Sequence, residues 1–171
     1  MRYQDCAEPA QAPDETDGEA RLADANINPR TGLATDYLNH FNEAVMLLEM
    51  LGDCPDCIGD FLAWQPLSYR EHFAASRFKG RDLAIAAYET SDPALRQSLD
   101  ALAGTMTAVL LAARGAMRAE MPPQGAAGVA SRAVACLKPL IAQAGAIING
   151  ETEGAASPQA AVDGLMRKRG S

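Results

Sequence analysis

The chain has 171 residues, enough for one domain with a buried core and some length left for terminal segments. Hydrophobic residues form 48% of the sequence but aromatic residues only 5%. This composition favours closely packed helices over a sheet, because strands are enriched in β-branched and aromatic residues. The formal net charge of −7 argues against nonspecific nucleic-acid binding, which needs clustered lysine and arginine.

Residues 1–32 form the first segment, which carries seven acidic and three basic side chains without any apolar period. This composition is typical of a disordered acidic arm. The segment also lacks the apolar region of a secretory signal. No stretch of the chain reaches the roughly 18 to 20 uninterrupted apolar residues that a bilayer span requires. We therefore expect a cytoplasmic protein.

Residues 33–150 form the second segment, in which the apolar residues follow a helical period. From Leu33 to Leu51 they recur at spacings of three and four, and the next residue, Gly52, is a natural stop. A short helix is expected over residues 53–64. Ser68 and Glu71 then have the spacing of a capping box, which starts another helix with a break near Gly80.

Two more helices are expected before residue 150. A long helix begins at Pro93 and ends before Pro122, and an Ala-rich helix covers about Val129–Ile148, with a kink at Pro139. The apolar seam of the long helix is expected to consist of Leu95, Leu99, Leu102, Met106, Val109, Ala113 and Ala116.

The strong periodicities are all helical, and they predict an all-α fold. We expect a single bundle of four to six helices, in which three longer helices carry the core. Residues 151–171 are expected to form a flexible tail with a short amphipathic helix.

The first predicted helix places Asp36, His40 and Glu43 nearly in line along one ridge. With His72, the other histidine, they could bind iron, zinc or haem, although the Glu-x-x-His order of helical di-iron proteins is absent. We favour a histidine at the core boundary that is hydrogen-bonded to Asp36 or Glu43. Phosphotransfer on His40 is a further alternative. The carboxylate of Glu43 argues against it, because it would repel an incoming phosphoryl group.

The sequence Cys-Pro-Asp-Cys places Cys54 and Cys57 around Pro55 at a predicted helix start, where a thiolate would be stabilised. Redox enzymes that use this device have a βαβ framework, and a zinc site needs two more ligands. We expect two small, partly buried thiols. Reversible oxidation of Cys54 and Cys57 to a local disulfide is the redox alternative.

The long helix also carries Leu110, Leu111, Arg114 and Met117 on the side opposite its predicted seam. A helix that is apolar over most of its circumference must be covered on more than one side. These four residues therefore predict a homodimer interface or a docking site for another protein.

The sequence contains none of the common phosphate-binding or nucleophile motifs. We expect a small cytoplasmic adaptor or regulator that acts through protein contacts, without a catalytic residue, a cofactor, a nucleic-acid partner or a membrane partner. The alternatives are a metal, haem or redox sensor that uses His40 and His72, and a phosphotransfer module. An enzyme would use Tyr37, His40, Tyr69 and His72 as acid–base groups.

Overall fold

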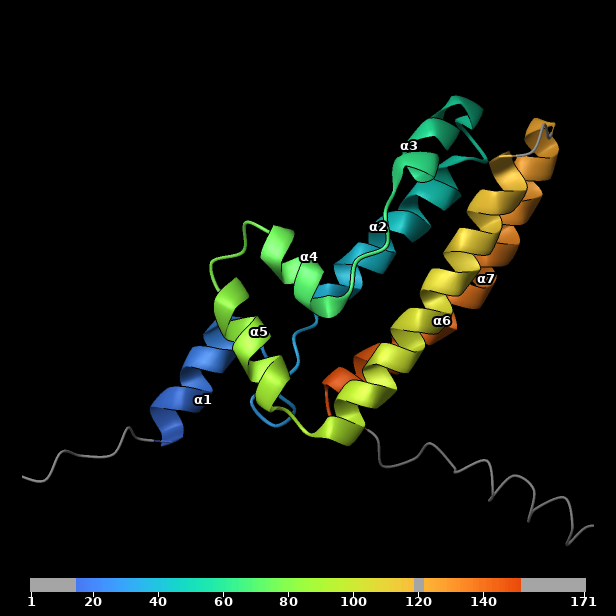
Figure 1. The fold of residues 1–171 in the computed structure, drawn as a ribbon. Helices are drawn as coiled ribbons and strands as arrows, with labels where there is room; N and C mark the ends of the chain where they lie inside the picture. The colour runs from blue at the N-terminus through green and yellow to red at the C-terminus, as the bar shows by residue number, and fades with distance from the viewer. Residues whose placement is uncertain (1–14, 119–121, 152–171) are drawn as a thin grey trace, which may run out of the picture.

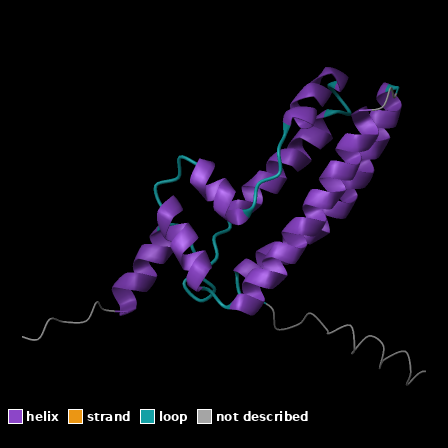
Figure 2. Cartoon of the chain, viewed as in Figure 1, coloured by secondary structure: helices purple, strands orange, loops and turns teal. Residues whose placement is uncertain are grey.

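The computed structural model describes residues 15–118 and 122–151, and the regular elements in these ranges are helical (Figures 1 and 2). The helices are α1 (Glu15–Asp24), α2 (Tyr37–Met50), α3 (Ile58–Ala63), α4 (Tyr69–Ala75), α5 (Arg81–Thr90), α6 (Pro93–Arg118) and α7 (Pro123–Ile148), with a 3-10 turn η1 at Pro55–Cys57. The predicted all-α class is confirmed. The predicted bundle of four to six helices is not, because the described ranges alone hold seven.

The core is formed where the three longest helices meet. Helices α6 and α7 run side by side as an antiparallel hairpin, and α2 lies against α7 (Figure 1). Phe41 and Leu48 of α2 and Leu137 of α7 are fully buried in this region. The short helices α4 and α5 pack against each other beside the lower part of α2.

Helix α6 buries a stripe that shares Leu99, Met106 and Ala113 with the predicted seam but is rotated from the rest of it. Its buried residues recur at spacings of four and three, and they are Leu99, Ala103, Met106, Leu110, Ala113 and Met117. Leu95, Leu102 and Val109 of the predicted seam are only half-buried. Because α6 contacts both α7 and α3, its most buried line lies between these neighbours and is rotated from the predicted one.

Several predicted helix ends are confirmed. Ser68 Oγ accepts from the Glu71 amide at 3.4 Å, and Glu71 Oε2 accepts from the Ser68 amide at 2.8 Å, which completes the capping box that starts α4. Gly80 lies directly before α5, in the predicted break. Helix α7 contains Pro139 as predicted but begins at Pro123, earlier than expected.

The predicted disordered arm over residues 1–32 is wrong for its described part. Helix α1 occupies Glu15–Asp24, and the segment after it buries Ile27 and Thr31. Residues 1–14 of the arm and residues 152–171 of the predicted tail lie outside the described residues.

The turn that follows α1 satisfies carbonyl groups at the C-terminal end of α7. Thr31 Oγ1 donates to the Ile148 carbonyl at 2.6 Å, and the Arg30 guanidinium donates to the Gly150 carbonyl at 2.9 Å. The last carbonyls of a helix lack partners within the helix, and a nearby cation also favours that end. This long-range contact explains why an acidic segment with little apolar period is ordered.

Candidate functional site

His40 lies on α2 and is 6% exposed. Its Nε2 accepts a hydrogen bond from the Leu67 amide at 3.0 Å, and its ring stacks on Trp64 with ring centroids 4.6 Å apart. The expected hydrogen bond to Asp36 or Glu43 is therefore wrong. An Nε2 that accepts carries no proton, so the proton of the neutral ring is on Nδ1. His40 thus holds the loop between α3 and α4 against α2.

The ring of the second histidine, His72, lies beside that of His40. The ring centroids of His40 and His72 are 5.8 Å apart. Burial, with a further effect from His72, lowers the pKa of His40 to about 4. Burial also lowers the pKa of His72, against an opposing effect of Asp36 and Glu43. Both imidazoles therefore favour the neutral form at pH 7.

The two imidazoles belong to an aromatic cluster that connects α2 with the segment from α3 to α5. The members of this aromatic cluster are Tyr37, His40, Phe41, Trp64, Tyr69, His72, Phe73, Phe78 and Tyr88. Eight of the nine aromatic residues of the chain fall between positions 37 and 88. That uneven distribution is the sequence signal that could have located the cluster.

The predicted metal ligands Asp36, His40, Glu43 and His72 do not form a metal site. No three histidine, cysteine or acidic side chains in residues 15–118 and 122–151 are grouped so that they could hold an ion. The Nε2 of His40 already accepts from a backbone amide, and Glu43 is exposed. The described part of the chain therefore shows no three-ligand site for iron or zinc at these residues.

The catalytic alternatives gain no support from the geometry. A phosphotransfer histidine must reach a partner's aspartate, whereas His40 is buried and its Nε2 is engaged. Burial raises the pKa values of Tyr37 and Tyr69 far above their usual range. Burial and a hydrogen bond to Asp100 raise the pKa of Tyr88 to about 12. These tyrosines therefore favour the protonated form at neutral pH.

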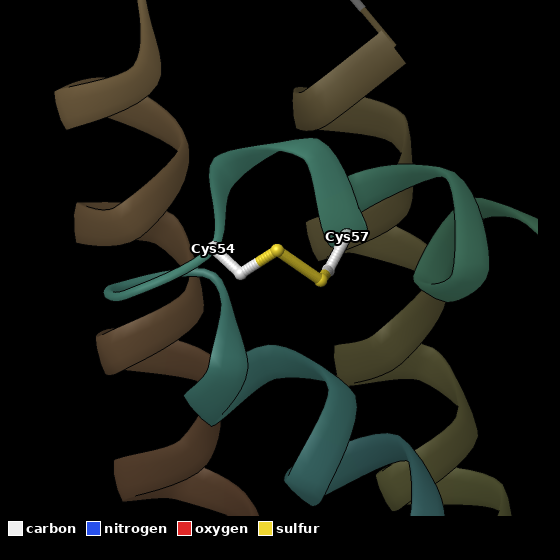
Figure 3. The surroundings of a disulfide bond; sticks show 2 residues. All are labelled: Cys54 and Cys57. Atoms are coloured by element: carbon white, nitrogen blue, oxygen red, sulfur yellow. A yellow bond between two sulfur atoms is a disulfide. The ribbon is translucent and has the colours of Figure 1, made fainter.

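Cys54 and Cys57 form a disulfide between the end of α2 and the start of α3, rather than the two free thiols that we expected (Figure 3). Their Cα atoms are 5.6 Å apart, and both residues are half-buried. Cys136 of α7 is exposed and carries a free thiol. The disulfide closes the turn that leads from α2 through η1 into α3.

The four predicted interface residues of α6 have different environments. Leu110 is 1% exposed and Met117 is also buried, so the prediction that they form an external interface is wrong. Arg114 is half-buried and donates to the Trp64 carbonyl at 2.7 Å, which ties α6 to the end of α3. Leu111 is 38% exposed and remains available to a partner.

Most residues of helices α6 and α7 are not fully buried. Within the described part of the chain, Pro93–Arg118 and Gln124–Ile148 are long and apolar enough to cross a membrane. In the most apolar 18-residue window of each helix, only 28% of the α6 window and 22% of the α7 window are buried. Core helices of soluble proteins can have the same length and apolar composition.

The comparisons with known proteins point to no relative. No protein-family model, no curated protein and no solved structure matches the chain. The function is therefore inferred from the geometry of the chain alone.

Proposed function

We propose that this protein is a small cytoplasmic adaptor or regulator that acts through protein contacts, and that the outer face of the α6–α7 hairpin makes them. The observation that carries the proposal is the low burial of the two longest helices. Only 28% of the most apolar window of α6 and 22% of that of α7 are buried. A helix that is apolar over much of its circumference is stable in water only when more than one side is covered.

The outer face of α6 is built from small residues around one larger side chain. Its exposed residues are Ala101, Gly104, Thr105, Ala108, Leu111, Ala112 and Gly115. A Cβ atom at Gly115 would meet nothing within 4 Å in the chain. Packing within the chain therefore does not require this glycine, which is about 1 kcal/mol less favourable than alanine inside a helix. A neighbour that approaches α6 closely from outside would require it.

We propose a second copy of this chain as the neighbour. Helices α6 and α7 have 26 residues each, so the hairpin presents a face about 39 Å long, which a second hairpin matches in length and apolarity. Every exposed residue of α6 from Ala101 to Gly115 is uncharged. Two copies can therefore meet along this stretch without opposing like charges, and a strongly charged partner would find no complement there.

Substitutions on two faces test this proposal. Leu111→Glu places a charge at the centre of the outer face and should convert a dimer to a folded monomer in size-exclusion light scattering at micromolar concentration. The matched control is Met46→Glu, because Met46 of α2 is 53% exposed and lies outside the proposed interface. Equal masses for both variants and the wild type would place the contact elsewhere or remove it.

A second variant separates association from folding. Gly115→Ala should raise the free energy of unfolding of the monomeric Leu111→Glu protein by about 0.5 to 1 kcal/mol, because the new Cβ meets open space. In the otherwise wild-type protein the same Cβ should weaken self-association. If the wild-type chain partitions into membranes and needs detergent to stay in solution, the exposed helices serve a membrane and the cytoplasmic dimer is contradicted.

A further inference from the structure

A cleft of about 420 Å³ lies beside the aromatic cluster, where α2, α4, α5 and α6 meet. Tyr88 of α5 reaches towards Asp100 of α6, and its hydroxyl donates to the two carboxylate oxygens at 2.7 and 2.8 Å. Ser68 and Glu71 of α4 line another part of the wall. The volume lies within the range of small-molecule sites, roughly 300 to 1,000 Å³.

Three of the hydroxyl donors along this wall already bond within the chain. Tyr37 donates to the Leu67 carbonyl at 3.1 Å, and Ser68 donates to Glu71 at 2.7 Å. Tyr88 likewise donates to the carboxylate described above. A ligand that contacts these three hydroxyl groups must therefore supply donors of its own.

The carboxylates of Glu71 and Asp100 in the cleft can accept further hydrogen bonds. Both bonds from Ser68 end on Oε2 of Glu71, so Oε1 is left to accept. The two oxygens of Asp100 share the single proton of Tyr88. An ionised carboxylate offers about four lone-pair positions, so each group can accept further hydrogen bonds. The hydrogen bonds from Ser68 also lower the pKa of Glu71, which keeps this carboxylate ionised at neutral pH.

The charges around the cleft favour a cation. The lining holds Glu71, Asp100 and one basic residue, Arg70, whose guanidinium pairs with Glu89 at 3.1 Å. Another guanidinium, that of Arg96, lies 5.8 Å from the centre of the Tyr88 ring. Residues 33–92 carry ten acidic and four basic side chains, within a chain of net charge −7. Such a field attracts positively charged ligands.

Gly104 keeps the α6 side of the cleft open. A Cβ atom there would meet nothing within 4 Å, and Gly104 is one of the residues that line the cleft. Glycine is unfavourable in a helix interior. No contact within the chain requires a glycine at position 104. The missing side chain therefore leaves room for a ligand.

We propose that this cleft binds an alkylammonium group between the carboxylates of Glu71 and Asp100. This chemistry is shared by free polyamines and by lysine side chains of a peptide. The ammonium supplies three donors to a wall on which three hydroxyl donors are already engaged, and its charge meets two carboxylates. Gly104 lies both in the cleft and among the exposed residues of the proposed dimer face, so the titrations are also run on the Leu111→Glu chain, which separates the two proposals.

Calorimetric titration of the full chain with spermidine, with a lysine-containing peptide and with the same peptide acetylated on Nε tests the proposal. Binding of spermidine or of the unmodified peptide, with loss on acetylation of the peptide, is expected, and the pattern identifies the source of the amine. Asp100→Asn should weaken binding by about tenfold or more, although its amide oxygen can still accept from Tyr88. The matched control is Asp82→Asn, which removes the same charge from α5 outside the cleft.

A variant that fills the cleft distinguishes binding inside it from a nonspecific attraction of the amine to surface charge. Gly104→Leu fills the cleft from α6 and should abolish binding without lowering the melting temperature. The proposal is overturned if neither amine binds, if Asp82→Asn weakens binding as much as Asp100→Asn, or if Gly104→Leu binds as well as the wild type.

Discussion

His40 makes the stability of the fold depend on pH in a predictable direction. In the unfolded chain its imidazole takes up a proton as the pH falls through about 6.5. In the folded chain, burial beside Trp64 and the engaged Nε2 keep it neutral until the pH approaches about 4. The unfolded state therefore binds more protons between these values, and the free energy of unfolding falls as the pH falls through the window.

The size of the effect follows from the two pKa values. A difference between the ordinary value of 6.5 and about 4 in the fold corresponds to about 3 kcal/mol, since each tenfold change in acid dissociation is worth about 1.4 kcal/mol. We expect a loss of about 2 kcal/mol by pH 5 and about 3 kcal/mol by pH 4, relative to pH 8. The pKa of His72 is also lowered by burial, so it adds to the loss in the same direction.

The comparison variant is His40→Gln, whose side-chain amide can accept from the Leu67 amide but does not titrate. Urea unfolding followed by circular dichroism at several pH values gives the free energy of unfolding of both proteins. The variant should be less stable than the wild type at pH 8, and this difference should shrink by about 3 kcal/mol as the pH falls to 4. A difference that stays constant with pH would refute the lowered pKa of His40.

Two further predictions concern α6 and the disulfide. Leu110→Ala should lower the free energy of unfolding by about 2 to 5 kcal/mol, as expected for a fully buried leucine, and the half-buried Leu102→Ala by about 1 to 2 kcal/mol. Urea denaturation measures both, and the reverse order would restore the seam predicted from the sequence. Reduction of the Cys54–Cys57 disulfide should lower the free energy of unfolding by about 2 kcal/mol, from the entropy of a four-residue loop. The double variant Cys54→Ser, Cys57→Ser should be insensitive to reductant, and a wild type whose unfolding is unchanged by reductant would show that the bond contributes nothing.

The helix positions were predictable because local chemistry sets them. Pro93 marks the start of α6, and the Ser68–Glu71 capping box marks the start of α4, through contacts within a few residues. The order of the N-terminal segment was not predictable in this way. Thr31 bonds to Ile148, 117 residues away in the chain, and neither composition nor periodicity reports a contact of that range.

The details of the site depend on tertiary contacts that sequence patterns leave open. The sequence placed His40 at the core boundary, but its partner is the backbone amide of Leu67, which no side-chain motif signals. The register of α6 was ambiguous for a related reason. Both the line through Leu102 and the line through Leu110 are apolar at helical spacing, and packing against α7 and α3 selects the second.

Sedimentation equilibrium of the wild-type chain at micromolar concentration tests the central claim most directly, because it measures mass without any assumption about shape. The proposed contact between two α6–α7 hairpins predicts a mass of about twice 18.1 kDa, with dissociation to the monomer on dilution. A mass of one chain at every concentration, with the apolar face of α6 still open to water, would contradict it.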